Sequence, residues 1–534
     1  MRINHIIKIF FLSVLVSGFA YGQAQQGGIL TYVESEFPRS YDPITAMDDI
    51  VNIRMTTMMY EGLFGYDIDR EVRSRLADSY TVGRNNQEIT VRMKRGKKWA
   101  DGREITARDV AKTLEAIWAS DNVQEQRIIG DIEEVHVQDN YTLRFLFQNP
   151  LPEDVMLRKL TFKLIPSHKI NNLPLTRQSG LARSPVGSGF YQMVRRGPTD
   201  ITMRANPYFR QRDGGNMGPY IDEVRMYVQT DVGTQIEFLL NQQVDVMVEI
   251  PPPAIARLRA AGFQIKPYES LSYHFIAINF THPILQEREI RQAMTYGFNR
   301  ENALDRIYQN QGTLISGPFP PASAFYVRDR DAGPFPYDPS EAIRLLSQAG
   351  FNERASDGTR INNNGERLSF TLVVPRHEGD DYTPRVTAQF ISDMNRIGIS
   401  VDLQELEFER WIQRVKYEQN FDLAFAQVVF DEAGNVAPMF LSTNNEPGAE
   451  NFISYNNPDA DALIKRFQET ASPSERININ RSLHRLLRDD CPFIFLWSLN
   501  KNAAAHQKVR NFMTRVTPFS FFDYVNEWYI REDW

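Results

Sequence analysis

Two side chains of opposite charge, Arg376 and Asp431, stand directly after stretches that are typical of strands. Arg376 follows the alternating segment 368–374, which Pro375 is expected to end, and Asp431 stands at the exit of the apolar segment 422–429. A guanidinium and a carboxylate at one rim can hold the carboxylate and the ammonium group of a zwitterion. The pair therefore predicts a binding site for a small charged solute.

The elements that would position this pair follow from the pattern between them. Segment 399–403 alternates as a further strand, and an amphipathic helix ended by Gly398 is expected before it. A shorter helix that carries Trp411 leads into the strand 422–429. The order β-α-β-α-β predicts parallel strands, and the ligands of such α/β sheets bind beyond the carboxyl ends of the strands.

Units of α/β type are expected on both sides of residue 280, which indicates two lobes. A β-α-β unit is predicted over 221–250, and segment 273–280 forms a strongly apolar strand. Because this strand lies near the expected crossover between the lobes, its residues Tyr273 and His274 are further ligand-binding candidates.

Each candidate also has a structural interpretation, which the sequence leaves open. Asp431 could cap a following helix, and Trp411 could lie in the core. Arg376 could be a surface residue paired with Glu378 or Asp380.

Length and composition limit the class of protein. The 534 residues are enough for two or three domains, and 42% hydrophobic with 24% charged residues is ordinary for a soluble globular protein. The net charge is -7 and no long basic run occurs. Nucleic acid is therefore not an expected partner.

The start of the chain predicts export. A basic beginning and the apolar run 9–19 are typical of a signal peptide, here residues 1–22, cleaved near Gly22 to Ala24. The only cysteine, Cys491, lies far from this leader, so we expect neither a lipid anchor nor an internal disulfide. We expect the Cys491 thiol to be buried and inert. An exported protein without an anchor needs an outer barrier to retain it, which favours the periplasm.

The motifs of enzymes and metal sites are missing from the sequence. There is no Gly-x-Ser-x-Gly elbow, and His377-Glu378 lacks the second histidine of a zinc helix. Asp459-Ala-Asp461 lacks the glycine and the distal glutamate of a calcium loop. We therefore expect no catalytic residues, no metal and no cofactor, and a hydrolase remains the lesser alternative.

An ordered series of short motifs runs along about 450 residues of the chain. It comprises Ser40-Tyr-Asp-Pro43, Tyr60-Glu-Gly-Leu63, Leu76-Ala-Asp-Ser79, Val91-Arg-Met-Lys-Arg-Gly-Lys-Lys-Trp-Ala-Asp-Gly102, Ile105-Thr-Ala-Arg-Asp-Val110, Pro185-Val-Gly-Ser-Gly-Phe-Tyr191, Asn206-Pro-Tyr-Phe209, Val244-Asp245, Ile290-Arg-Gln-Ala293 and Gly317-Pro-Phe-Pro-Pro321. In these motifs the chain resembles the peptide and nickel class of bacterial extracellular solute-binding proteins, family 5. Members of this family are the receptors of ATP-binding-cassette importers.

The resemblance implies a fold: the two-lobed periplasmic-binding-protein fold, which is α/β, with an additional small α+β domain and a cleft between hinged lobes. It implies the following boundaries: lobe I from residues 27–63, 187–279 and 501–534, the small domain from 64–186, and lobe II from 280–500.

The resemblance also implies roles for the site residues. Asp431 would bind the α-ammonium group of a peptide, Arg376 its carboxylate, and Trp411 would line the pocket. Gln427-Val428 replace the Gly-Trp that usually precedes the aspartate, and Pro438 comes about three residues late.

The predicted function is that of a monomeric periplasmic receptor that captures di- or oligopeptides by lobe closure and passes them to the membrane subunits of an importer. A non-peptide solute (a nickel chelate, an opine or a sugar) is the main alternative, and a receptor that signals without transport is another.

Overall fold

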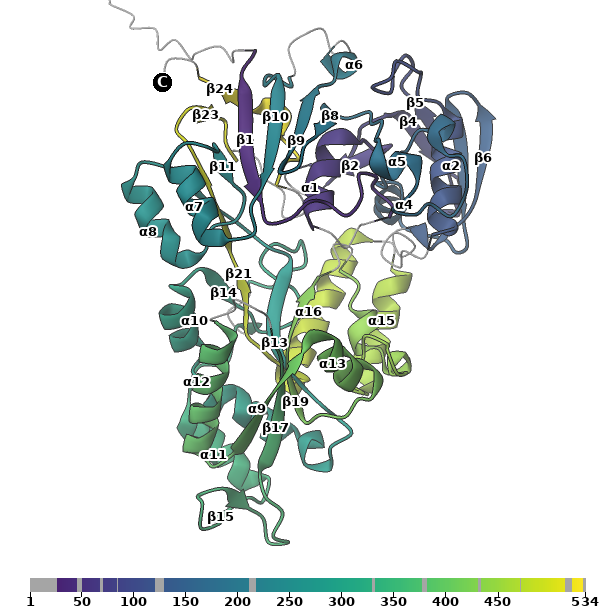
Figure 1. The fold of residues 1–534 in the computed structure, drawn as a ribbon. Coiled ribbons are helices and arrows are strands. Elements are labelled where there is room, and N and C mark those ends of the chain that lie inside the picture. The colour runs from purple at the N-terminus through teal and green to yellow at the C-terminus, as the bar shows by residue number, and fades with distance from the viewer. Residues whose placement is uncertain are drawn as a thin grey trace, which may run out of the picture.

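The computed structural model describes residues 26–45, 50–67, 71–83, 85–120, 129–210, 218–328, 332–376, 382–430, 434–470, 472–513 and 521–531. Three of its sheets have seven, five and four strands. The part built on the seven-stranded sheet is called lobe I, the part built on the five-stranded sheet lobe II, and the part built on the four-stranded sheet the small domain (Figure 1). This arrangement confirms the predicted α/β fold.

Lobe I is a mixed sheet in which the first strand lies at the centre. The strand order is β12 (Gln264–Tyr268), β22 (Lys501–Ala505), β11 (Val246–Met247), β1 (Ile29–Glu34), β10 (Glu223–Val228), β9 (Asp200–Ala205) and β8 (Tyr191–Arg196). β1 is parallel to both β10 and β11, and α7 (Val232–Leu240) connects these two strands, as the β-α-β prediction requires. Helices α1 (Ile50–Met59) and α8 (Pro252–Ala260) complete the lobe.

The small domain packs beside lobe I. Its sheet has the order β4 (Ala77–Val82), β5 (Glu88–Met93), β7 (Thr142–Phe147) and β6 (Ile132–Asp139), and α2 (Ala107–Trp118) and α4 (Glu153–Lys159) flank it. One cluster of buried apolar residues contains both Leu30 of lobe I and Ile89 of the small domain. The two parts therefore share a core and form one body.

Lobe II contains the two strands after which Arg376 and Asp431 were predicted to stand. The strand order is β18 (Ser400–Glu407), β17 (Ser369–Arg376), β19 (Leu423–Val429), β13 (Ser272–Ile278) and β20 (Phe493–Phe495). β17 is parallel to β18 and to β19, which confirms the predicted order. The surrounding helices are α9 (Arg288–Gly297), α10 (Arg300–Tyr308), α11 (Pro339–Gln348), α12 (Thr383–Ile397), α13 (Phe408–Ile412), α14 (Ala437–Phe440), α15 (Pro458–Glu469) and α16 (Pro473–Asp490).

Pro375 does not end its strand, so that expectation is wrong. β17 continues to Arg376, and Pro375 pairs with Leu406 of β18. On its other side β17 pairs with β19 at Leu372 and Val373, three and two residues earlier. One side of the strand at Pro375 therefore has no strand partner among the described residues, and a missing N–H is tolerated there.

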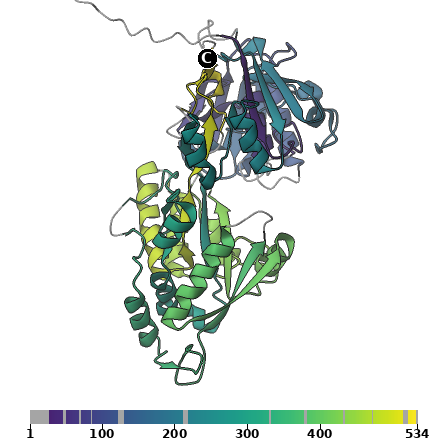
Figure 2. The ribbon, with the colours of Figure 1, turned by 60° about the vertical axis from the view of Figure 1, so that its left-hand side comes forward.

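The lobes are joined by two chain crossings that lie side by side. Residues 269–271 connect β12 to β13, and Asn500 connects β21 (Trp497–Leu499) to β22. The hydroxyl of Ser498 donates to the backbone oxygens of Ser270 (3.2 Å) and Ser272 (2.9 Å). Figure 2 shows the lobes stacked lengthwise with these crossings between them.

The position of β13 refines the division into lobes, which otherwise remains a prediction. The predicted boundaries assign this strand to lobe I, but it pairs with β19 and β20 inside the sheet of lobe II. Each of the four clusters of described buried apolar residues lies on one side of the crossings. Separate cores on either side of a narrow connection permit relative motion of the lobes.

Within the described part of the chain, no helix is both long and apolar enough to cross a membrane.

Candidate functional site

The carboxyl ends of parallel strands from both lobes lie near the crossings. In lobe II, β19 is antiparallel to β13, so that Val429, its last residue, pairs with Ser272 next to the first crossing. In lobe I, Glu34 ends β1 and binds Arg54 (Oε2–Nη1 2.8 Å), and Arg54 also approaches Glu249 (3.8 Å). Such strand ends are where open α/β sheets bind ligands, so the junction of the lobes is the candidate site.

The lobe I side of this junction is a charged cluster that the sequence analysis did not single out. Arg54 and Glu34 are buried, and Glu249 also binds Lys501 (2.6 Å), the first residue of the returning strand β22. The partners lie 20 and 252 residues apart in the chain, so no local pattern reveals the cluster. It ties the end of β1 to the second crossing.

Arg376 lies at the carboxyl end of β17, as predicted. Its side chain is 57% exposed, and its guanidinium reaches Glu407 (3.2 Å) and Glu405 (3.7 Å) of β18. Its partners among the described residues are therefore these carboxylates of the neighbouring strand. Glu378 and Asp380, the partners weighed from the sequence, lie outside the described residues.

Asp431 also lies outside the described residues, but both of its flanks are described. The ring of Phe430 packs edge-on against Phe319, with centroids 5.5 Å apart. A Cβ atom on Gly434 would come within 2.3 Å of the ring of Phe325. The chain on either side of Asp431 therefore packs against the segment 319–325.

Trp411 lies in the core of lobe II. Only 6% of it is exposed, and its indole Nε1–H donates to the backbone oxygen of Val373 (3.4 Å). Phe408, which is 45% exposed, stacks over it with the ring centroids 6.3 Å apart. The indole thus supports the end of β17, with an exposed aromatic ring above it.

Tyr273 and His274 lie at the start of β13, opposite Val428 and Gln427 of β19. Tyr273 is fully buried, and its hydroxyl has no hydrogen-bond partner among the described residues. Burial raises the pKa of this hydroxyl. His274 is half-buried, with its ring 6.0 Å from that of Phe425. The strand β13 therefore begins near the crossing between the lobes, as predicted, but the Tyr273 side chain points into the core.

Beyond Ala424, the far edge of β19 has no strand partner among the described residues. β17 pairs with β18 from Ser369 to Arg376, whereas its register with β19 consists of Leu372 and Val373. The Phe430 N–H donates to Leu271 on the β13 side (3.0 Å). Because successive residues of a strand alternate, the backbone N–H and C=O of Gln427 and Val429 face away from β13. Val429 is 75% exposed, so this edge is accessible.

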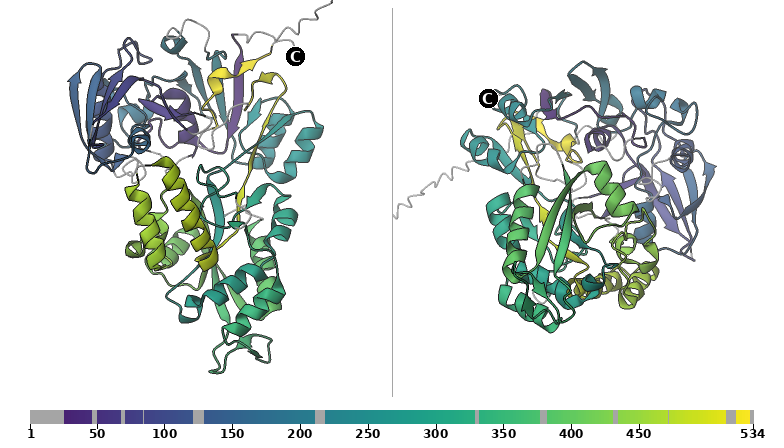
Figure 3. Two further views of the ribbon diagram at one scale, coloured as in Figure 1. Left: turned by 180° about the vertical axis from the view of Figure 1, so that it is seen from behind. Right: turned by 60° about the horizontal axis from the view of Figure 1, so that its bottom comes forward.

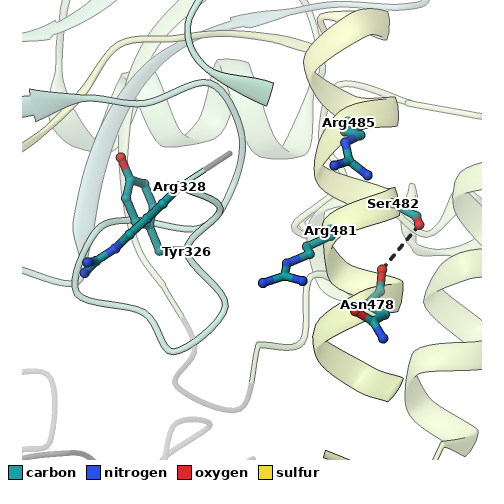
Figure 4. Close-up of a pocket in the computed structure, with 6 residues that line it drawn as sticks. All are labelled: Tyr326, Arg328, Asn478, Arg481, Ser482 and Arg485. Atoms are coloured by element: carbon teal, nitrogen blue, oxygen red, sulfur yellow. Dashed lines mark hydrogen bonds between the residues drawn. The ribbon is translucent and has the colours of Figure 1, made fainter. Parts of the chain in front are cut away.

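A pocket of about 580 Å³ lies between the segment 326–328 and α16 (Figure 4). Its lining residues are Tyr326, Arg328, Asn478, Arg481, Ser482 and Arg485. Sequence reasoning missed it. The spacing of Arg481 and Arg485 on one helix face is a visible signal, but Arg328 comes from a distant part of the chain.

The pocket borders the crossings between the lobes. Burial raises the pKa of Tyr326, the charge of Arg328 lowers it, and that of Glu269 in the first crossing raises it. Near the start of α16, Arg476 binds Asp154 of α4 in the small domain (3.2 Å). Figure 3 (left) shows α15 and α16, in yellow-green, directly below the blue small domain.

The single cysteine and the possible metal ligands are the side chains to consider for reactive or metal-binding groups. Cys491 is buried, as predicted, and burial raises the pKa of its thiol to about 11. Among the residues that the structure describes, no cluster of three or more His, Cys, Asp or Glu side chains could hold a metal ion.

Comparison with known proteins shows what this chain is similar to. The family model described as "Bacterial extracellular solute-binding proteins, family 5 Middle" matches residues 71–449. The oligopeptide-binding protein AppA of Bacillus subtilis is 24% identical over 512 residues, which cover 92% of this chain and 90% of AppA. The glutathione-binding protein GsiB of Salmonella choleraesuis is 23% identical over 487 residues, 90% of each chain.

Solved structures share the fold over nearly the whole chain. AppA in complex with a nonapeptide matches with a TM-score of 0.76 and 22% identity, over 95% of this chain and 100% of that one. NikZ from Campylobacter jejuni in complex with Ni(L-His) matches with a TM-score of 0.75 and 19% identity, over 94% and 99%.

Proposed function

Because the chain belongs to the bacterial extracellular solute-binding proteins of family 5, a family of binding proteins rather than enzymes, we propose that it captures a peptide between its two lobes and delivers it to the membrane subunits of an ATP-binding-cassette importer. Relatives are named for peptide ligands, an oligopeptide in one case and glutathione in another. The peptide is our proposal for this chain.

The open edge of β19 is the observation that carries this proposal. A strand edge with unpaired N–H and C=O groups binds an extended peptide as an added strand, through main-chain hydrogen bonds that any sequence can form. Gln427 and Val429 offer such groups next to the crossing between the lobes. A sugar or an opine has no repeating N–H and C=O groups to match this edge.

The ends of the peptide would be bound by charge. We propose that Asp431, which follows this edge by two residues, binds the α-ammonium group, and that Arg376 at the end of β17 binds the carboxylate. Phe408 and Trp411 would form an aromatic wall between them. His274, opposite Gln427, lies on the strand that supports the edge.

Lobe closure would bury the bound peptide. An exposed ion pair contributes only about 0–1 kcal/mol, whereas a desolvated one contributes more, so closure decides whether the charged ends add affinity. The two crossings and the separate cores of the lobes fit such a hinge.

We further propose that the protein acts in the periplasm, after removal of residues 1–22. Support comes from the leader-like sequence, from the lack of a lipid-bearing cysteine next to it, and from the extracellular family. Closed around its solute, the protein would dock on the membrane subunits as a monomer.

The test is a thermal-shift screen of the mature protein against four solute classes: di- to nonapeptides, glutathione, the nickel–histidine chelate and sugars. A ligand at 100 times its dissociation constant should stabilise the protein by about 2.7 kcal/mol. Peptides should raise the melting temperature. Stabilisation by the chelate or a sugar alone would contradict the proposal.

A further inference from the structure

The pocket between segment 326–328 and α16 has an unusual lining, because half of its six residues are arginines. Arg481 and Arg485 are four residues apart on α16, so they project from the same face of the helix, and Figure 4 shows Arg481 reaching from the helix toward the segment. Arg328 comes from the opposite wall. No acidic residue is part of this lining.

Two of the three arginines of this pocket have no partner among the described residues. Neither Arg328 nor Arg481 forms an ion pair or a hydrogen bond with any residue that the structure describes. Other arginines of α16 are paired: Arg476 with Asp154, and Arg488 with Asp489 (2.7 Å). Like charges four residues apart on a helix repel each other. The positive charges of Arg328 and Arg481 are therefore available to an anion bound in the pocket.

We infer that this pocket binds an oxyanion of the captured solute, a carboxylate or phosphate group carried on a side chain, so that acidic peptides are the preferred ligands. This inference rests on the proposed function and adds a substrate class to it. The planar guanidinium fork matches the geometry of both oxyanions. Asn478 adds an amide donor at the wall of the same pocket.

Tyr326 fits this role as a neutral donor. Burial raises the pKa of its hydroxyl, which therefore stays protonated at neutral pH and can donate to an anion. Ser482 is not a donor of this kind, since its hydroxyl already donates to the backbone oxygen of Asn478 (3.3 Å; Figure 4).

Aromatic contacts lead from the end of β19 toward the pocket, because Phe319 also packs against Phe325 (ring centroids 6.2 Å apart). Phe319 packs on Phe430, which follows the edge directly, and Phe325 precedes Tyr326 of the pocket. A volume of about 580 Å³ is enough for a charged side chain and its water. In this inference, a peptide laid along Gln427–Val429 places an acidic side chain in the pocket.

The experiment is calorimetric titration of the mature protein with three probes: triglutamate, triphosphoserine and triglutamine. Homopolymeric probes remove any dependence on which residue reaches the pocket. The titrations are repeated with Arg328→Gln, with Arg481→Gln, and with Arg259→Gln as the control. Arg259 lies on α8, is exposed, and likewise has no ion pair among the described residues.

Triglutamate or triphosphoserine should bind the wild type at least about tenfold more tightly than triglutamine, as expected for one charge-assisted hydrogen-bonded contact. Arg328→Gln and Arg481→Gln should each remove most of that preference, and Arg259→Gln should keep it. Whichever acidic probe binds more tightly identifies the oxyanion. Equal binding of all three probes, or a preference that survives both substitutions, would overturn the inference and leave the proposed function standing.

If none of the three probes binds, the peptide proposal is judged by the thermal-shift screen, and the pocket is judged with citrate and inorganic phosphate alone. A rise in melting temperature with either ion, lost in Arg481→Gln, supports the inference. An unchanged melting temperature with both ions overturns it.

Discussion

The indole nitrogen of Trp411 donates a hydrogen bond to the backbone oxygen of Val373 (3.4 Å), at the last residue of β17 that pairs with β19. Beyond this point β17 continues along β18, while β19 continues along β13. The bond thus gives the Val373 carbonyl a partner where the two strands separate, and beyond this point the edge of β19 has no strand partner among the described residues.

Replacing Trp411 with Phe should lower the free energy of unfolding by about 1–3 kcal/mol, because the buried Val373 carbonyl loses its donor. Urea unfolding measures this. Trp118→Phe is the control, since Trp118 is 40% exposed and its replacement should cost less than about 0.5 kcal/mol. Equal effects of the two substitutions would contradict the role given to Trp411.

Asp431→Asn should weaken the binding of a peptide with a free amino terminus at least about tenfold, because a buried ammonium group loses its counter-charge. The same peptide with an acetylated amino terminus should bind the wild type and Asp431→Asn equally weakly. Calorimetry of the four combinations isolates the contact, with the exposed Asp459→Asn as control. A difference between free and acetylated peptide that persists in Asp431→Asn would rule this contact out.

Tyr273→Phe should raise stability by about 1 kcal/mol or more, since the hydroxyl is buried and has no hydrogen-bond partner among the described residues. Peptide affinity should not change, because the side chain lies inside the core. Denaturant unfolding and calorimetry on the same protein samples measure both quantities. Lower affinity would show that Tyr273 reaches the ligand after all.

His484 should make stability fall with acid. Burial lowers its pKa from 6.5 to about 4, and the ring interacts with Ser316 (3.0 Å) and the backbone of Ala332 (3.2 Å). Below pH 6.5 the histidine takes up a proton more readily in the unfolded protein than in the folded one, so acid favours the unfolded state. The loss in the free energy of unfolding grows as the pH falls to about 4 and totals about 3 kcal/mol.

Urea unfolding at pH 7.5 and pH 4.5 measures this loss in the wild type and in His484→Gln. Because glutamine does not titrate, the variant should lose less stability than the wild type over this interval. The same loss in both proteins would assign the acid sensitivity to other groups.

Much of the fold could be predicted from local patterns. The alternation in 368–374 and the glycine at 398 predict the strand and the helix end that the structure has, since Gly398 adopts φ 90° as the cap of α12. Pro375 misled the prediction, because its effect depends on whether the neighbouring strand still pairs at that point. That is a property of the sheet and not of the segment.

The site was harder to predict than the fold. Strand order places Arg376 at a sheet edge, but its partners Glu405 and Glu407 come from another strand and depend on register. The strand pattern indicates β13 correctly, yet it cannot tell that Tyr273 faces the core. The arginine pocket joins residues more than 140 positions apart, which no spacing reveals.

The most direct measurement of the central claim, that a peptide binds as an added strand on β19, is calorimetry of one tight-binding peptide with wild type, Val429→Ala and Val429→Pro. Proline removes the N–H that faces the open edge, and the Phe430–Leu271 hydrogen bond on the other side does not involve it. We predict that Val429→Ala binds as the wild type does and that Val429→Pro binds about three- to tenfold more weakly, the value of one hydrogen bond. Equal affinity of the alanine and proline variants, both folded, would contradict the account.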